Sequence, residues 1–162
     1  MKKQTQTLTY FEHVDDKTLS KGQKELLIRA KNNLTGSYSP YSNFKVSAAL
    51  LLANGEIVCG TNQENLAYPS GLCAERVAIY YAKSRYPDVA IEKIALTAFS
   101  DKFTVENPIP PCGACRQAMI EYRLNQKKPI ELIMRGEKGQ IVVINDLKEL
   151  MPLHFCETNL RK

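Results

Sequence analysis

The order of helical and strand patterns between residues 19 and 151 most constrains how this chain can fold. Apolar residues recur at helical spacing in some segments and form short β-type runs in others. The predicted helices cover residues 19–36, 73–85, 112–125 and 146–151, and the predicted strands cover 44–53, 56–61, 91–99, 130–135 and 140–144. Strands that alternate with helices in this way predict an α/β fold with a layered sheet of about five strands, partly parallel.

Local signals mark where several of these elements begin and end. Ser20 is a suitable N-cap for the first helix, and Gly36 is a suitable stop. Asn54 and Gly55 form a dipeptide that favours a two-residue hairpin turn between the first two strands. Pro111 precedes the third helix, where the missing N–H of proline costs little.

The composition is that of one ordinary globular domain. The chain has 162 residues, of which 44% are hydrophobic and 24% charged, close to globular averages. Residues 18–162 are expected to form a single domain, and residues 1–17, which show no clear period, an N-terminal extension. Because a domain of this size does not need a metal to fold, any metal site would be free for chemistry.

Membranes and nucleic acid are not expected as partners. No apolar run approaches the ~18–20 residues of a membrane span, and the polar N-terminus lacks the apolar core of a signal peptide. The net charge of +5 comes from scattered basic pairs with acidic residues between them, which is typical of a solvated surface. We therefore expect a cytoplasmic protein.

Three cysteines indicate a metal centre. Cys112 and Cys115 form a CxxC motif at the start of one predicted helix, and Cys73 begins another. If a right-handed crossover joins the second and third strands, both helices begin at the same edge of the sheet, where open α/β sheets build their sites. Three thiolates without a fourth protein ligand are the pattern of a catalytic zinc site with one open position.

Glu75 and Arg76 follow Cys73 and have roles that fit such a centre. A carboxylate beside a metal-activated water, but not bound to the metal, is suited to general acid–base catalysis, which we assign to Glu75. Arg76 could donate to the ligand sulfurs and offset the charge of three thiolates on Zn²⁺. The alternatives are a first-turn acid that stabilises the helix dipole and an exposed helix arginine.

The remaining cysteines and the histidines are not expected to bind metal. Cys59 lies in a predicted strand and is expected to be a small buried core residue. Cys156 has no partner at ligand spacing. His13 and His154 are expected to have surface or packing roles.

Longer motifs carry a resemblance to a known family. They are Cys73-Ala74-Glu75-Arg76, the run from Pro111 to Gln117, Asn62-Gln63-Glu64-Asn65 and Tyr68-Pro69. Together they resemble the cytidine deaminases of the small homotetrameric type with three cysteine ligands, over residues 39 to 155. The resemblance implies a three-layer α/β/α sandwich with a mixed sheet of about five strands.

The resemblance also implies an activity. Cys73, Cys112 and Cys115 would hold one Zn²⁺ per subunit. The enzyme would be a hydrolase of pyrimidine salvage that converts free cytidine, deoxycytidine or both to the uracil nucleoside and ammonia. Water activated on the metal would attack C4 of the cytosine ring while Glu75 moves the protons, as in the wider class of zinc deaminases.

Six further positions match family residues that contact the nucleoside or a neighbouring subunit. Asn62 and Glu64 would hydrogen-bond the ribose hydroxyls, although such residues can also cap the end of a strand. Phe44 would pack against the pyrimidine, or serve only as a core residue at a strand start. Tyr68 and Ala74 are further substrate contacts, and Phe155 would reach a neighbouring subunit's site or pack on its own subunit.

Departures from the family pattern leave other functions open. Ser47 stands where relatives commonly have Gly, Lys45 is an unusual neighbour, and the loop 100–111 is longer than usual. A deaminase of a related nucleoside such as blasticidin S is the nearest alternative. A nucleic-acid deaminase, a protein with structural zinc and a dithiol redox protein are less compatible with the cysteine pattern and the Asn62–Glu64 pair.

Overall fold

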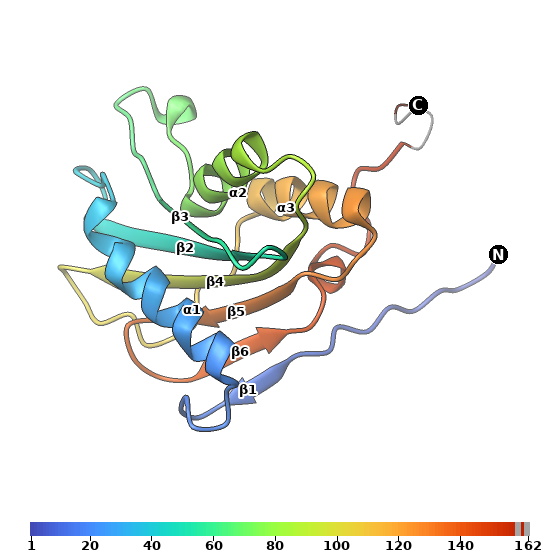
Figure 1. Cartoon of the computed structure of the whole chain (residues 1–162), viewed down its shortest axis with the longest axis horizontal. Helices are drawn as coiled ribbons and strands as arrows, with labels where there is room; N and C mark the ends of the chain where they lie inside the picture. The colour runs from blue at the N-terminus through green and yellow to red at the C-terminus, as the bar shows by residue number, and fades with distance from the viewer. Residues whose placement is uncertain (158–159, 161–162) are drawn as a thin grey trace.

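The computed structural model describes residues 1–157 and residue 160, and it contains one mixed sheet of six strands. The elements are β1 (Phe11–His13), α1 (Lys21–Asn32), β2 (Phe44–Leu52), β3 (Ile57–Thr61), α2 (Ala74–Arg85), β4 (Ile91–Ser100), α3 (Gly113–Gln126), β5 (Glu131–Arg135) and β6 (Ile141–Ile144). Three short 3₁₀ helices complete them: η1 (Asn33–Gly36), η2 (Tyr68–Ser70) and η3 (Leu147–Leu150). Helix α1 covers one face of the sheet and helices α2 and α3 cover the other, which confirms the expected α/β/α layers (Figure 1).

The strand directions place α2 and α3 at one edge of the sheet. The order across the sheet is β1-β6-β5-β4-β2-β3. Strands β3 and β4 are each antiparallel to β2, so they run in the same direction, and β4 and β5 are parallel. Because α2 follows β3 and α3 follows β4, both helices begin at the same edge, as the sequence predicted.

The expected count of about five strands is one too low. The sixth strand is β1, within residues 1–17, and it pairs antiparallel with β6 through Phe11 opposite Val143. Two of its three side chains are exposed, so it has no alternation of apolar and polar residues. The backbone of β1 pairs with β6 and covers its edge. The sequence of β1 alone does not predict this strand.

The ends of the elements follow the local signals. Ser20 caps α1, where its hydroxyl accepts from Gln23 N and the Gln23 side chain accepts from Ser20 N. Gly36 ends η1, which continues α1. Gly55 has a φ of 86° in the hairpin turn between β2 and β3. The predicted helix at 146–151 is the shorter η3, whose N-cap is Asp146.

Two apolar clusters hold the layers together. The larger lies between the sheet and helices α2 and α3, and it includes Leu50, Ile79 and Met119. The smaller lies beneath α1 and includes Leu26 and Ile133. The two clusters fix both helical layers against the sheet.

Among the described residues, no helix is long and apolar enough to cross a membrane.

Gly60 sets how closely α2 approaches the sheet. A Cβ atom at this position would lie 2.5 Å from Ala78 N and 2.9 Å from Ala74 O. Only glycine permits this contact between β3 and the first turns of α2. The close approach fixes the depth at which α2, and therefore Glu75, sits on the sheet.

The residues that depart from the family pattern in β2 face α1. The Ser47 side chain is fully buried; its hydroxyl accepts from Asn33 Nδ2 at 3.2 Å and lies 3.4 Å from Gly60 O. Lys45, two residues earlier on the same strand face, pairs with Asp101 at 3.3 Å. Ser47 and Lys45 therefore lie on the sheet face opposite α2 and α3.

Candidate active site

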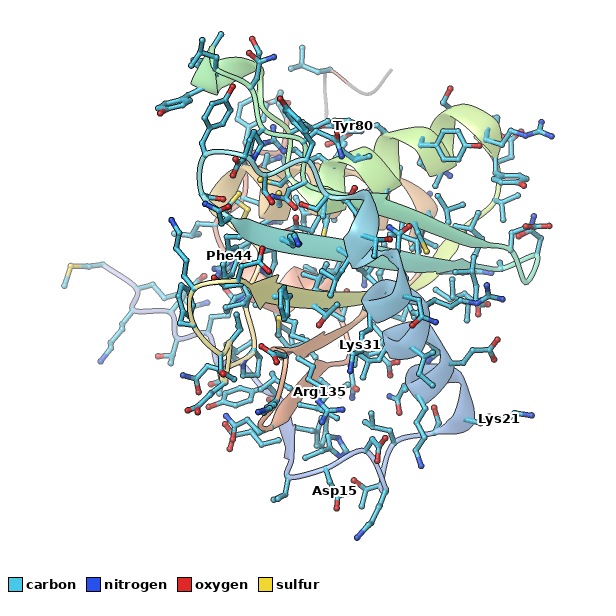
Figure 2. All side chains as sticks on the ribbon, turned by 90° about the vertical axis from the view of Figure 1, so that its left-hand side faces the viewer. Asp15, Lys21, Lys31, Phe44, Tyr80 and Arg135 are labelled. Carbon is cyan, nitrogen blue, oxygen red and sulfur yellow. The ribbon has the colours of Figure 1, made fainter. Side chains whose placement is uncertain are left out.

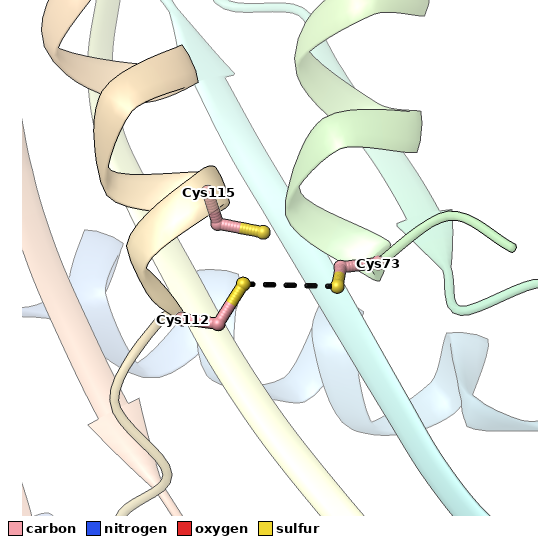
Figure 3. A group of neighbouring side chains, drawn as sticks. All are labelled: Cys73, Cys112 and Cys115. Atoms are coloured by element: carbon pink, nitrogen blue, oxygen red, sulfur yellow. Dashed lines mark hydrogen bonds between the residues drawn. The ribbon is translucent and has the colours of Figure 1, made fainter. Parts of the chain in front are cut away.

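Cys73, Cys112 and Cys115 meet at the start of two helices. Cys73 is the N-cap of α2, Cys112 is the N-cap of α3, and Cys115 lies in the first turn of α3. Their three Sγ atoms lie within 4.8 Å of one another, and those of Cys73 and Cys112 are 4.0 Å apart (Figure 3). The crossover from β3 to β4 thus brings together residues that lie 39 positions apart in the chain.

The three thiols fit a tetrahedral Zn²⁺. Zinc–sulfur bonds of about 2.3 Å in tetrahedral geometry place sulfurs about 3.8 Å apart, close to the 4.0 Å between Cys73 and Cys112. A disulfide would need about 2.05 Å. Among the described residues, the metal-binding group contains these three cysteines and no fourth ligand. A zinc held by these three cysteines would have one position left for a reactant.

The electrostatics of the group favour thiolate at Cys73. Hydrogen bonding from Cys115 and Arg76 lowers the pKa of Cys73 to about 5, against an opposing effect of burial. Arg76 Nη2 lies 3.6 Å from Cys73 Sγ. The pKa of Cys115 is raised by its hydrogen bond with Cys73 and by burial. A divalent cation would lower the pKa of each ligand thiol.

Glu75 is a buried carboxyl group beside these sulfurs. Its side chain belongs to the first turn of α2, and the residue is only 5% exposed. Burial and the neighbouring Cys73 thiolate raise its pKa above the ordinary value. A buried carboxyl group with a raised pKa beside a reactant is a candidate for acid–base catalysis.

A cavity of about 690 Å³ opens beside the sulfurs and Glu75. Its walls come from the loop before β2, from the segment between β3 and α2, from the first turn of α2, and from the loop before α3. The lining residues that the sequence predicted are Asn62, Glu64, Tyr68, Cys73, Ala74, Glu75, Arg76 and Cys112. The volume is in the range of small-molecule sites.

Asn62 lies in the cavity wall, and hydrogen bonds fix the orientation of its side-chain amide. Its Oδ1 accepts from Val46 N at 2.7 Å and from Ser37 Oγ at 2.6 Å, and its Nδ2 donates to Phe44 O at 2.9 Å. A backbone N–H can only donate and a carbonyl can only accept, so the orientation of the amide is fixed. The second N–H of the Asn62 side-chain amide has no acceptor within the described part of the chain, so it can donate to a ligand.

Glu64 lies near Asn62 and is held by the loop at residues 41–42. Its carboxylate accepts from Tyr41 N at 2.9 Å, from Ser42 N at 3.2 Å and from the Ser42 hydroxyl. Desolvation opposes ionisation, but these donors lower the pKa of Glu64 below its ordinary value. The ionised carboxylate can only accept hydrogen bonds from a ligand.

The other predicted site residues lie farther from the cavity or at its rim. Phe44 does not line the cavity, and its ring stacks on Phe103 with centroids 6.2 Å apart. Tyr68 is 75% exposed and meets the Tyr41 ring edge-on. Phe155 is 72% exposed, and its backbone exchanges two hydrogen bonds with the Gln117 side chain.

The cysteines and histidines set aside in the sequence lie outside the metal group. Cys59 was expected to be a buried core residue, but it is only half-buried against the cluster beneath α1. Cys156 is exposed. His13 Nδ1 lies 2.6 Å from the Thr18 hydroxyl, and His154 Nδ1 lies 3.0 Å from Met151 O.

Ser37, Ser42 and Ile109 are site residues that the sequence did not reveal. Ser37 and Ser42 hold Asn62 and Glu64, and Ile109 lines the cavity from the loop before α3. Their side chains meet the site only through folding, so no motif at fixed spacing could have identified them. The clustering of Ser and Tyr at residues 37–42 was the one weak signal.

Residues 20–128 match the family model for the cytidine and deoxycytidylate deaminase zinc-binding region. The chain is 40% identical over 127 residues to the cytidine deaminase of Halalkalibacterium halodurans, an alignment that covers 77% of this chain and 87% of that protein. It is 36% identical over 138 residues to the cytidine deaminase of Sporosarcina psychrophila, with 85% and 93% covered.

Solved structures show the same relationship. The cytidine deaminase of Burkholderia pseudomallei superposes with a TM-score of 0.70 at 35% identity, which covers 82% of this chain and 98% of that one. The cytidine deaminase of Mycobacterium tuberculosis gives a TM-score of 0.63 at 26% identity, with 83% and 97% covered. The matched family region includes all three cysteines and Glu75.

Proposed function

Since the chain belongs to the cytidine and deoxycytidylate deaminase family, we propose that it hydrolyses free cytidine and deoxycytidine to the uracil nucleosides and ammonia. The observation that carries this proposal is the buried Glu75 beside three clustered thiols, at the wall of a nucleoside-sized cavity. Cys73, Cys112 and Cys115 are the residues that would hold one Zn²⁺ in each subunit.

Glu75 is the proposed proton carrier. A bound zinc would act as a Lewis acid and lower the pKa of a water molecule to about 7. The Glu75 carboxylate accepts the proton that the attacking water loses and delivers it to ring nitrogen N3. It then carries the second proton to the amino group on C4, which leaves as ammonia. Burial suits Glu75 to this role because it brings the pKa of the carboxyl closer to neutrality.

Asn62 and Glu64 are the proposed sugar contacts. Asn62 can donate one hydrogen bond from Nδ2, and Glu64 can accept one at its carboxylate. A single hydroxyl can accept from the first and donate to the second, so one hydroxyl satisfies both residues. The pair therefore supports a nucleoside substrate with or without a 2′-hydroxyl.

The remaining predicted residues have supporting roles in the proposal. Arg76 donates to Cys73 Sγ and offsets the negative charge of three thiolates. Ala74 and Tyr68 line the cavity in which the base and sugar bind. The Phe44 carbonyl orients Asn62, and the Phe44 ring, which stacks on Phe103, is the proposed contact of the pyrimidine.

We also propose that four subunits assemble and that the exposed Phe155 contacts a neighbouring subunit's site. The support is the 72% exposure of this large apolar side chain, which nothing covers fully within one chain. Pyrimidine salvage in the cytoplasm is the proposed setting. The alternative substrate blasticidin S is not favoured, because the relatives reported above are cytidine deaminases.

An ammonia-release assay tests the substrate. Purified protein is supplied separately with cytidine, deoxycytidine, deoxycytidylate and blasticidin S, and bound zinc is measured in parallel. We expect turnover of the two free nucleosides. Glu92→Gln, which changes an exposed glutamate on β4, should match the wild type and serves as the control for variants of Glu75. Exclusive turnover of deoxycytidylate or blasticidin S, or of none of the four, would refute the proposal.

A further inference from the structure

A row of polar residues crosses four strands beneath α1. Thr61 pairs with Ser47, Ser47 pairs with Thr97, and Thr97 pairs with Arg135, on strands β3, β2, β4 and β5. The first three residues are at most 6% exposed. A polar row in the interior of a sheet is unusual, because a buried polar group is costly unless it is hydrogen-bonded.

The row is hydrogen-bonded except at its last member. Thr61 Oγ1 donates to Gly36 O at 2.8 Å, Ser47 Oγ accepts from the Asn33 side chain, and Thr97 Oγ1 lies 3.4 Å from Gly136 O. Arg135 Nε is buried and has no hydrogen-bond partner among the residues that the structure describes. A buried donor without a protein acceptor is expected to donate to a ligand or to an ordered water molecule.

A second cavity lies at this end of the row. It has a volume of about 130 Å³ and lies between α1 and the carboxyl ends of the parallel strands β4 and β5. Thr97 and Arg135 line it, and it shares no lining residue with the larger cavity. The volume is several times the ~30 Å³ of a water molecule and far below that of a nucleotide site. It suits a small ion or a single phosphoryl group.

The charges around this cavity are mainly positive. Lys24 and Lys31 line it from α1, Arg135 lines it from β5, and Asp16 and Glu137 are its acidic lining residues. Figure 2 labels Lys31 on α1 and Arg135 on β5. Among the described residues, none of these five charged groups forms an ion pair with another charged side chain. Three cations against two carboxylates leave a net charge of +1 for a ligand to neutralise.

We propose that this cavity binds a phosphate-class oxyanion, either inorganic phosphate or the phosphoryl group of a small phosphomonoester. The guanidinium of Arg135 and the ammonium groups of Lys24 and Lys31 supply charge-assisted hydrogen bonds to its oxygens. Asp16 and Glu137 accept only, so they favour an anion that carries a proton over one that does not. Phosphate keeps at least one proton near pH 7, whereas sulfate has none.

Calorimetric titration at fixed ionic strength tests the proposal. The protein is titrated with inorganic phosphate, with glycerol phosphate and with sulfate. We expect saturable binding of phosphate, of the monoester or of both, and binding of sulfate at least tenfold weaker. Binding of only one phosphate compound identifies the natural class of ligand.

Variants on and off the cavity locate the site. Arg135→Gln should weaken phosphate binding at least tenfold, as expected for the loss of a charge-assisted hydrogen bond. Lys31→Gln changes an exposed residue and should leave the fold intact. This variant should bind phosphate several-fold more weakly. Arg29→Gln removes the same charge from α1 outside the cavity and should bind as the wild type does. Deaminase turnover, which needs none of these residues, reports whether each variant is folded.

Three outcomes would overturn the proposal: no saturable binding to the wild type, equal binding of sulfate and phosphate, or equal losses in Arg135→Gln and Arg29→Gln. None of these outcomes depends on which nucleoside the larger cavity accepts.

Discussion

The Sγ atoms of Cys73 and Cys112 lie 4.0 Å apart, although each residue is the N-cap of a different helix. The distance is set by the direction of the strands that precede the two helices and by the close approach of α2 to β3. A helix N-terminus carries a partial positive charge, which favours thiolates at the N-cap and so favours metal binding. The metal centre is therefore a product of the topology.

Loss of one thiol should remove the metal. We expect about one zinc per chain in purified protein, because three thiolates bind zinc tightly. Cys112→Ser should lose most of this zinc and all measurable deamination, since a hydroxyl is a poor replacement for a thiolate. Elemental analysis by mass spectrometry measures the metal. Cys156→Ser, which changes an exposed cysteine outside the group, should keep both. Full zinc content in Cys112→Ser would contradict the assignment.

Glu75→Gln should separate proton transfer from metal binding. The amide is close in size to the carboxyl but cannot carry a proton, so turnover should fall by at least ~10²-fold. Zinc content should stay at the wild-type level because Glu75 is not a metal ligand. Steady-state kinetics and elemental analysis on the same sample measure both. Normal turnover in this variant would show that another group moves the protons.

Arg76→Gln should shift the pH dependence of zinc binding. Arg76 lowers the pKa of Cys73, so without it the thiol holds its proton to higher pH. Protons then compete with zinc over a wider range, and the pH of half-release should rise. Turnover at pH 7 should also fall. Zinc release followed with a chromogenic chelator measures the first effect, and Arg85→Gln at the exposed end of α2 is the control. Unchanged release and turnover would refute a role for Arg76.

The ion pair between Arg123 and Asp146 should contribute to stability above acidic pH only. Arg123 Nε donates to both carboxylate oxygens at 2.8 and 3.0 Å, and the side chains are 17% and 20% exposed. Desolvation opposes ionisation, but these bonds lower the pKa of Asp146. Asp146→Asn should cost about 1–3 kcal/mol at pH 7.

That cost should disappear as the pH falls. A depressed native pKa gives stability that is complete above the unfolded value of about 3.9 and is lost as the pH falls through the native value. Urea unfolding at pH 7 and at the lowest pH at which the protein remains folded measures the difference. The exposed pair of Lys45 with Asp101 offers a control, because Asp101→Asn should cost at most about 1 kcal/mol. A constant cost at all pH values would contradict this account.

Gly60→Ala should disturb both stability and activity. The new Cβ would lie 2.5 Å from Ala78 N, so α2 must move away from β3 and carry Glu75 with it. We expect a loss of about 1–3 kcal/mol in unfolding free energy and a lower turnover. Gly22→Ala in α1, where nothing lies within 4 Å of the new Cβ, should be neutral or stabilising. Equal thermal stability of the two variants would contradict this account, because it would show that α2 can move away from β3 without loss of stability.

The sequence by itself determined the features that depend on neighbouring residues. The capping box at Ser20, the hairpin at Gly55 and the periodic apolar residues of α2 act over a few positions, so their signals survive in a single sequence. The three cysteines that are positioned to hold a metal could also be predicted, because sulfur chemistry restricts the uses of a CxxC motif and a third cysteine at a helix start.

Only the tertiary structure decided the features that depend on distant partners. Strand β1 pairs with the edge of β6, and Ser42 reaches Glu64 because the loop before β2 lies against the segment that follows β3. Arg135 joins a polar row only through the register of four strands. Register and loop packing are set by the burial of the whole core, so no local pattern records them.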